Sequence, residues 1–441
     1  MRAHLQYLWY RLTSTLWVVP ALMISSAVLL AFGMLYLDTV APQRWVEQFR
    51  WLLRIGPEGA RQVLATIAGS MVTVASLVFS MTLVTLTLAS SQLGPRLITR
   101  FVRDTVNQIV LGTFVATFVY AIFVLQTVSE TDPDSFVPHL SVIVALILAL
   151  ISLVWLIYFI HHVADSIQAD TVIAELSQQL SEAIERRFPE IDRSAAAPLE
   201  TPFLDRLAES PAVVAAPKSG YVQAIDAGSL LREATMNGLV IKIDTRPGDF
   251  VVERAPLLQV WPAEHLSDAL GEALCEPIVI GPKRTPTQDI DFAVAALVEI
   301  ALRALSPGIN DPQTAMTCID RLSAALAQIM AEEDPPSLVP DADGVIRLIV
   351  RPATFEGVIG AVFNPIRHAG RDHARVLSRL AQALTVLAGF ARDQKQREAI
   401  ARQAAAMDEA CREVALDPLG REEVEDSLAA LRRALADSRQ D

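Results

Sequence analysis

Four long apolar runs without a charged side chain constrain this sequence more than any other feature. They are Leu16–Leu37, Val63–Ala89, Ile109–Val128 and Leu140–Ile160. Each run exceeds the roughly 18 apolar residues that identify a membrane-spanning helix. The chain is 52% hydrophobic with a mean hydropathy of +0.36, and this apolar character is concentrated before residue 161. We therefore predict a transmembrane domain of four helices over residues 1–160, with the lipid bilayer as its partner.

Basic residues near the runs predict the orientation, because cytoplasmic loops carry an excess of Lys and Arg. The loop "SETDPDSFVPH" after the third run has neither, whereas the first run and the loop after the second are flanked by Arg2, Arg11, Arg96, Arg100 and Arg103. Both termini and the C-terminal region are therefore expected in the cytoplasm, below a bacterial inner (plasma) membrane. The basic segment "RWVEQFRWLLR" opposes this orientation, but its apolar and charged faces are typical of a helix in the headgroup plane.

The first run follows two arginines, as the apolar region of a signal peptide does. It is longer than the usual 7–15 residues of such a region, and no small-x-small cleavage pattern follows it. We therefore interpret it as a membrane anchor.

The rest of the chain predicts a cytoplasmic α+β region. Residues 161–187 continue the fourth helix as a helical stalk, and residues 188–210 form a proline-rich linker. Residues 211–262 hold short β-branched or aromatic segments between Gly and Pro, which predict a small β module. Its pieces "KSGYVQAID" and "RPGDFVVERAPLLQV" resemble half-motifs of the biotinyl/lipoyl barrel-sandwich, although no Lys stands in a hairpin-tip setting.

Residues 263–441 are predicted to be a mainly helical domain. Two helices are expected at Asp289–Leu305 and Pro312–Ala331, and a strand "VIRLIVRPA" follows them. Three more helical stretches are then expected, at Phe355–Arg392, Gln394–Val414 and Arg421–Ser438.

Charge, cysteine usage and missing motifs argue against several classes of function. The formal net charge is −13, whereas a nucleic-acid-binding protein needs a basic face. Cys275, Cys318 and Cys411 cannot all pair within one chain and match no zinc spacing, so we interpret them as buried free thiols. The sequence contains no Ser-His-Asp elbow, P-loop or GxGxxG. We expect no enzyme activity, no cofactor, no metal and no nucleic acid partner.

The stretch "ALRALSPGINDPQTA" gathers polar side chains around a Pro-Gly break between two predicted helices. Pro307 and Gly308 end the first helix, and Asn310 or Asp311 can cap the second, so a rigid helix–turn–helix is the favoured interpretation. In the alternative, the free N–H groups at the second helix start bind a small anion or a partner carboxylate. That site would be lined by Ser306, Asn310, Asp311 and Thr314.

The second run carries a stripe of small and hydroxylated residues. At 100° per residue one side of the helix collects Thr66, Gly69, Ser70, Thr73, Ser76, Ser80 and Thr87. Such a stripe lets helices pack closely, which is the favoured interpretation, or lines an aqueous path in which hydroxyls replace part of an ion's hydration. Because no charged residue lies within the four runs, transport would be passive rather than proton-coupled.

His161 and His162 close the fourth helix. A position at the membrane interface is the favoured interpretation, and gating by pH is the alternative, because histidine titrates near neutrality. His161 shares a helical face with Asp165, but no third ligand at metal-binding spacing is evident.

Several stretches together resemble a known family. They are "ALSPGINDPQTA", the preceding "TQDIDFAVAALVEIALRAL", "SSQLGPR" after the second run, and the "HH" closing the fourth. In these the chain resembles a bacterial family of predicted membrane proteins catalogued only as a domain of unknown function. The resemblance implies four N-terminal membrane helices and a C-terminal soluble region, and it implies no reaction or substrate.

Two functional hypotheses follow from the sequence. The first is a homo-oligomeric channel or pore for an ion or small anion, with a cytoplasmic vestibule. Oligomerisation belongs to this hypothesis because four helices with few polar groups cannot easily enclose water alone. The second is a membrane-anchored scaffold or sensor whose cytoplasmic domain binds a ligand or partner protein.

Overall fold

The computed structural model describes the chain as two compact units, Met1–Thr171 and Val172–Asp441. The described residues are 17–40, 56–92, 104–128, 137–166, 168–185, 210–285, 288–332 and 337–437. The five arginines that predict the orientation, the segment 44–54 and residues 188–209 of the predicted linker lie outside these ranges. Each unit is described by itself.

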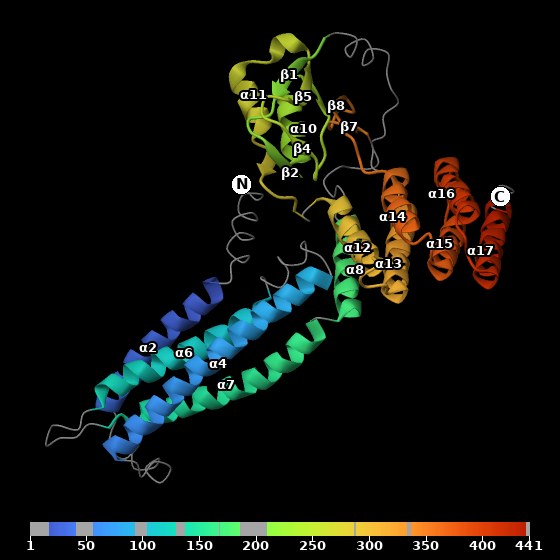
Figure 1. Ribbon diagram of the computed structural model, residues 1–441. Coiled ribbons are helices and arrows are strands. Elements are labelled where there is room, and N and C mark those ends of the chain that lie inside the picture. The colour runs from blue at the N-terminus through green and yellow to red at the C-terminus, as the bar shows by residue number, and fades with distance from the viewer. Residues whose placement is uncertain are drawn as a thin grey trace. The chain divides into compact units, whose positions relative to one another are not determined.

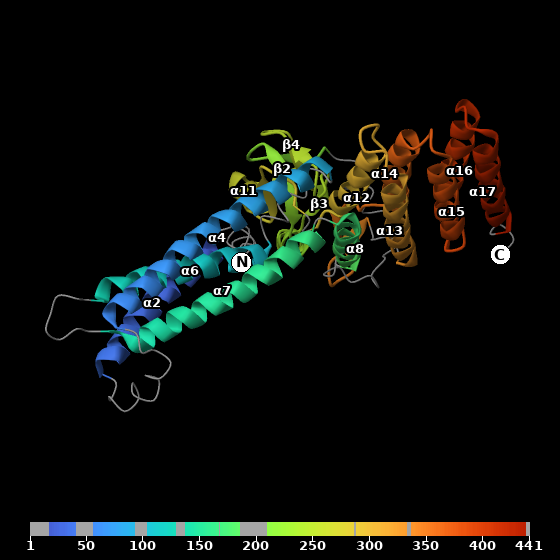
Figure 2. The ribbon, with the colours of Figure 1, turned by 60° about the horizontal axis from the view of Figure 1, so that its bottom comes forward.

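The first unit is a bundle of four helices, as predicted (Figures 1 and 2). All four are long and apolar enough to cross a membrane. They are α2 (Val18–Val40), α4 (Pro57–Gln92), α6 (Thr105–Thr127) and α7 (His139–Ser166). Helix α6 packs against each of the other three and is the most buried of them. The bundle is therefore organised around α6.

Close packing in the bundle depends on small residues and on interhelical hydrogen bonds. A Cβ atom at Gly112 of α6 would stand 2.6 Å from Sδ of Met23 and 3.2 Å from Cα of Pro20, both on α2. The hydroxyls of Thr117 and Ser152 bond to each other between α6 and α7 at 3.1 Å. Small residues that admit close backbone contact, and hydroxyls that bond across helices, are what hold membrane helices together.

The helices are longer than the apolar runs. Helix α2 continues three residues past its run, to Val40, and so includes Asp38. The Asp38 carboxylate accepts hydrogen bonds from the start of α7.

The second unit begins its β part at residue 212, and strands from two regions of the chain build it. The strands are β1 (Ala212–Ala215), β2 (Gly220–Ile225), β3 (Val240–Ile243), β4 (Phe250–Val251), β5 (Pro256–Trp261), β6 (Ile278–Gly281), β7 (Leu338–Pro340) and β8 (Ile346–Ile349). A five-stranded sheet has the order β1-β5-β3-β8-β7, and a three-stranded sheet has the order β4-β2-β6. Pairing is antiparallel except between β3 and β8.

One apolar core fills the β part. Its buried members come from both sheets, and include Val222, Ile241, Leu258, Ile280 and Leu348. Helices α10 (Ala227–Met236) and α11 (Asp268–Cys275) and a short 3-10 helix, η2 (Ala263–His265), connect the strands. Asp226 caps α10, since its carboxylate accepts from the Ser229 backbone N–H at 2.9 Å. The predicted α+β region is thus confirmed.

The helical part is a stack of hairpins. Its helices are α12 (Ile290–Ala304), α13 (Pro312–Ala331), α14 (Phe355–Ala369), α15 (Ala374–Ala388), α16 (Gln394–Glu413) and α17 (Pro418–Asp437). Successive hairpins stack so that α14 packs on α12, α15 on α13, α16 on α14 and α17 on α15. The stretch expected over Phe355–Arg392 is two helices, because Gly370 caps the first and the chain turns there. A stack in which each helical hairpin contacts only the hairpins next to it is typical of an α-solenoid.

Helix α8 (Ala169–Glu185) belongs mostly to this second unit. Gln168 separates it from α7, and both ribbon views place it beside α12 and α13 (Figures 1 and 2). Its apolar face, with Val172, Ile173 and Leu180, is buried. Helix α12 has no exposed residue, which is typical of a helix that is apolar nearly all round and covered on every side.

Candidate functional site

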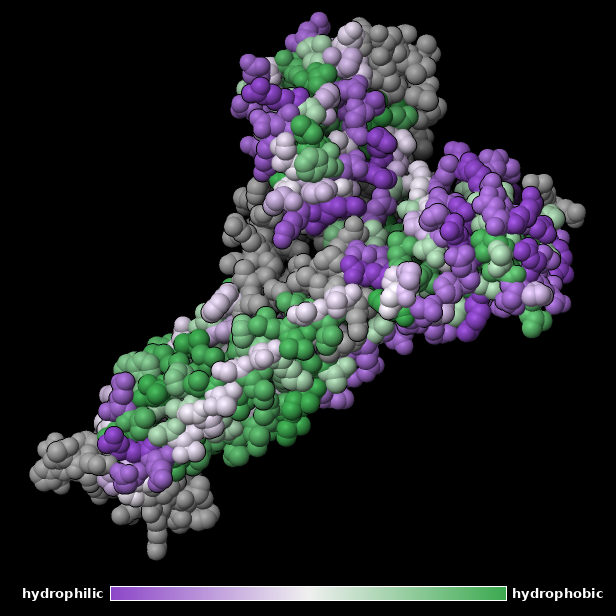
Figure 3. All heavy atoms as spheres, viewed as in Figure 1, coloured by the Kyte–Doolittle hydropathy of each residue, from purple (hydrophilic) through white to green (hydrophobic). Residues whose placement is uncertain are grey.

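The hydroxyl stripe of α4 faces away from the other three helices. All seven predicted members, Thr66, Gly69, Ser70, Thr73, Ser76, Ser80 and Thr87, are exposed. The buried residues of the same helix include Leu64, Ile67 and Val78, which lie on the opposite side at 100° per residue. Figure 3 shows the stripe as a pale band along the green surface of the bundle. No path through a single bundle is lined by these residues.

Five of the six hydroxyl groups of the stripe donate to the backbone of their own helix, those of Thr66, Ser70, Thr73, Ser76 and Thr87. Thr66 Oγ1 donates to the Gln62 carbonyl at 2.7 Å, Thr73 Oγ1 to the Gly69 carbonyl at 3.0 Å, and Thr87 Oγ1 to the Leu83 carbonyl at 2.9 Å. These bonds satisfy the donors and leave oxygen lone pairs on the surface. The stripe is therefore stable beside hydrocarbon and can still accept hydrogen bonds from water or from another helix.

Two large apolar side chains interrupt the stripe. Leu77 is 61% exposed and Val84 is 56% exposed, and both project from the side that carries Thr73 and Ser80. They stand seven residues apart, or two turns of the helix. Along the length of α4, hydroxylated residues on the outward face are thus interrupted by apolar residues.

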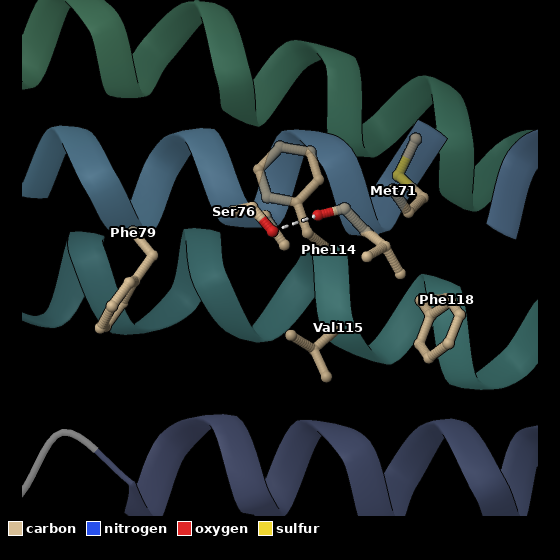
Figure 4. Close-up of a pocket in the computed structure, with 8 residues that line it drawn as sticks. Met71, Ser76, Phe79, Phe114, Val115 and Phe118 are labelled. Carbon is tan, nitrogen blue, oxygen red and sulfur yellow. Dashed lines mark hydrogen bonds between the residues drawn. The ribbon is translucent and has the colours of Figure 1, made fainter. Parts of the chain in front are cut away.

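An apolar hollow of about 330 Å³ lies next to the stripe, between α4 and α6. Figure 4 shows Phe79 and Phe118 at its two ends, with Phe114 and Val115 between them. The remaining lining residues are Met71, Val72, Ala75 and Ser76. Ser76 is the one residue shared with the stripe, and its hydroxyl donates to the Val72 carbonyl at 3.0 Å. Nothing in the sequence pattern indicated this hollow, because it depends on how α4 meets α6.

A carboxylate clamp joins α2 to α7 at one end of the bundle. Asp38 accepts from the backbone N–H of Leu140 at 2.9 Å, from that of Ser141 at 3.0 Å, and from the Ser141 hydroxyl at 2.6 Å. Tyr120 of α6 adds a bond to the Ser141 carbonyl at 3.1 Å. Asp38 therefore caps α7 from another helix, a role usually filled by the residue just before the helix start.

His162 and His161 differ in their surroundings. His162 Nε2 lies 2.6 Å from Asp104 Oδ2, its ring stacks on Tyr158, and both members of the pair are partly buried. Asp104 also caps α6 through the Val106 backbone N–H at 2.9 Å. His161 is exposed and pairs with Asp165 at 3.4 Å. His162 thus ties the end of α7 to the start of α6, and gating remains a prediction for both histidines.

The loop after α12 satisfies its polar groups locally. Asp311 accepts from the Thr314 backbone N–H at 3.1 Å and from the Thr314 hydroxyl at 2.6 Å, and Ser306 Oγ donates to the Arg303 carbonyl at 2.6 Å. Asn310 adopts a left-handed φ of 50°, which asparagine tolerates better than most residues. The hydrogen bond from Thr314 holds the pKa of Asp311 below its ordinary value. This carboxylate occupies the helix start where an anion would dock.

The two acids at the start of α12, Asp289 and Asp291, take separate roles. Asp289 caps the helix through the Phe292 backbone N–H at 2.9 Å and accepts two hydrogen bonds from Arg284 at 2.8 Å. Burial raises the pKa of Asp289, and Arg284 offsets this only in part. Asp291 instead pairs with Arg246 of the β part at 2.9 Å. In the described part of the chain no three His, Cys, Asp or Glu side chains are placed to hold a metal ion.

Comparison with known proteins places the chain among membrane proteins. A model of the family "Predicted membrane protein (DUF2254)" matches residues 13–386. Two uncharacterized proteins, Rv1290c of Mycobacterium tuberculosis and Mb1321c of Mycobacterium bovis, are each 34% identical over 354 residues. The match spans 79% of this chain and 67% of each relative. No solved structure matches the chain. The chain therefore belongs to the DUF2254 family of predicted membrane proteins.

Proposed function

We propose that this protein is a homo-oligomeric channel of a bacterial inner membrane, with a pore lined by the outward face of α4. One observation carries the proposal. The most hydroxylated face of any of the four spanning helices is turned away from its own bundle. A helix face that meets only lipid needs no hydroxyl groups, whereas a face that meets water or a second helix uses them.

The pore is proposed to form between copies of the chain. Each copy contributes one stripe, and the lone pairs of Thr66, Thr73 and Ser80 face a shared axis. Oxygen atoms along such an axis replace part of the hydration shell of a permeating ion. The stripe residues carry no charge, so a passive path for an ion or small solute fits better than a proton-coupled transporter.

The proposed orientation places both termini and the second unit in the cytoplasm, following the arginine distribution. A cysteine label introduced near either terminus would then react only after the membrane is permeabilised. Reaction in intact cells would contradict this orientation without bearing on the pore.

A conductance measurement with matched variants tests the pore. The double variant Thr73→Val and Ser76→Ala keeps side-chain size and removes two hydroxyls from the stripe. Thr113→Val is the control, because Thr113 is buried on α6 and its hydroxyl donates to the Ile109 carbonyl. In reconstituted liposomes we expect the double variant to lower ion flux about threefold or more, and the control to leave the flux unchanged. A wild-type protein that passes no ion or small solute at varied pH and membrane tension would contradict the proposal.

A membrane-anchored scaffold or sensor is the second candidate, and the stacked hairpins favour it. Solenoids present extended surfaces to partners, and α12 to α17 form such a stack. Replacing the four helices by an unrelated membrane anchor separates the two candidates. If the replaced protein still restores the phenotype of a deletion strain, the scaffold is supported and the channel is not.

A further inference from the structure

We infer that the hollow between α4 and α6 is a binding site for one acyl chain of a membrane phospholipid. The hollow is an open groove between the two helices and not an enclosed cavity. Both of its walls come from helices long and apolar enough to span a membrane. The inference concerns a ligand of the bundle and does not depend on whether α4 lines a pore.

The depth of the hollow selects a hydrocarbon chain. Its residues on α4 run from Met71 to Phe79, near the middle of Pro57–Gln92, and those on α6 run from Phe114 to Phe118, in the middle of Thr105–Thr127. The midpoints of two spanning helices lie near the centre of the bilayer, where the surrounding lipid presents its acyl chains. The molecule available to fill the hollow at that depth is the acyl chain of a lipid.

The lining chemistry also selects a hydrocarbon chain. The side chains are aromatic or aliphatic except for Ser76, and its hydroxyl already donates to the Val72 carbonyl. No polar group in the lining lacks a partner, so water would gain little there and a polar ligand would lose its hydrogen bonds. An engineered apolar cavity of about 150 Å³ stays dry and binds benzene. A hollow about twice that size accommodates a chain segment rather than a single small molecule.

The shape of the hollow favours a chain over the side chain of another copy. Figure 4 shows Phe79 and Phe118 apart along the two helices, with Phe114 and Val115 between them. A side chain projects from a neighbouring helix at one level, whereas an acyl chain runs along the bilayer normal and follows the groove between α4 and α6. Selectivity over the surrounding lipid arises from dispersion contacts with three aromatic rings, because the hydrophobic effect contributes nothing between two hydrocarbon phases.

Photo-crosslinking in vesicles tests the site. The probe is a phosphatidylcholine with a diazirine near the middle of one acyl chain, and adducts are mapped by peptide mass spectrometry on the full-length protein. We expect adducts on the hollow residues to exceed those on the exposed face of α7 about threefold. Ala75→Phe fills the hollow and should bring its labelling down to the level of α7. Ala65→Phe, an exposed alanine of α4 outside the lining, should leave labelling of the hollow unchanged.

A second filling variant, Val115→Phe, reproduces the effect from α6 if Ala75→Phe does not fold. Equal labelling of the hollow and of α7 would overturn the inference, because the hollow would then meet only bulk lipid. Protein-to-protein crosslinks from a photoreactive residue at position 115, with no lipid adduct, would also overturn it and would assign the hollow to a second copy. A wild-type protein whose hollow is labelled by lipid but which passes no ion or small solute would contradict the channel and leave the lipid site supported.

Discussion

At the scale of single residues, buried or half-buried carboxylates fix where elements begin and meet. Asp38, Asp104, Asp226, Asp289 and Asp311 each accept from a backbone N–H at a helix start. Those that precede their own helix in sequence are predictable, because an Asp just before an apolar periodic segment is a known start signal. Asp38 caps a helix 102 residues away in sequence, so no local pattern could reveal it.

The Asp38 clamp predicts a specific loss of stability. Asp38→Ala removes three hydrogen bonds from the start of α7, and loss of a helix cap costs about 1 kcal/mol, up to about 2. Thr39→Ala is the control, since the neighbouring hydroxyl donates only to the Tyr36 carbonyl of its own helix. Amide exchange at Leu140 and Ser141 in detergent micelles should accelerate in the first variant only. Unchanged exchange in Asp38→Ala would show that the cap contributes nothing.

A second carboxylate, Asp341, predicts an acid-sensitive turn between β7 and β8. Burial disfavours its ionised form, but the hydrogen bond from Arg347 Nε at 2.8 Å and the Val345 and Asp343 backbone N–H groups outweigh burial and lower its pKa. The carboxylate therefore stabilises the folded state above its unfolded pKa of 3.8, and this contribution is lost as pH falls through the lower folded pKa. Amide protection of β8 should decline below about pH 4.

Substitution of Asp341 distinguishes the contribution of the Asp341–Arg347 pair from the protonation of other carboxylates at low pH. Asp341→Ala leaves Arg347 without its partner in a buried setting, which costs about 3 kcal/mol. Asp343→Ala is the control in the same turn, because that residue is exposed. Hydrogen exchange of β8 at pH 7 should rise steeply in the first variant and hardly in the second. Equal exchange in the two variants would contradict the role given to the pair.

At the scale of elements, the sequence predicts whether a segment is a helix or a strand, and its residue range, better than it predicts which other element the segment packs against. Inside a bilayer the backbone N–H and C=O groups of a spanning segment must form hydrogen bonds within the segment. A long uncharged run is therefore a helix whatever its neighbours are. The pairing of β3 with β8 joins Ile241 to Leu348 in parallel, and no signal near either strand indicates it. Likewise the stripe on α4 could be listed from periodicity, but its outward direction depends on how α4 packs against α6. The β part therefore includes three strands from outside the predicted module, β6, β7 and β8, and only β8 corresponds to a strand that the sequence predicted.

The outward face of α4 predicts a constriction if copies share an axis. Leu77 is the largest side chain on that face near the middle of the helix, and a ring of leucines repels water from a narrow pore. Leu77→Ser should therefore raise ion flux about tenfold. Leu150→Ser is the control, because Leu150 is equally exposed, at 65%, on α7. If the wild type conducts and Leu77→Ser has the same ion flux, the constriction of the pore lies at another residue.

At the scale of the whole molecule, the chain consists of a unit with four candidate spanning helices, up to Thr171, and a second unit from Val172 onward. Residues 13–386 match the family model, and α16 and α17 follow that match. Both helices are more polar than the hairpins before them, and exposed acids such as Glu422, Glu423 and Asp426 cover α17. A polar outer hairpin is what ends a solenoid without exposing its core. The family assignment thus covers the bundle, the β part and most of the stack.

Cysteine accessibility tests whether the outward face of α4 meets water, as the proposed pore requires. In a background without Cys275, Cys318 and Cys411, single cysteines replace Thr66, Thr73, Ser80 and Thr87 on the stripe, and Phe79 and Leu83 beside it. A charged thiol reagent reacts with thiolates, which form in water and not in hydrocarbon. We expect modification at all four stripe positions and none at the two flanking positions. Equal protection at all six positions would place the stripe against lipid or protein and contradict the pore.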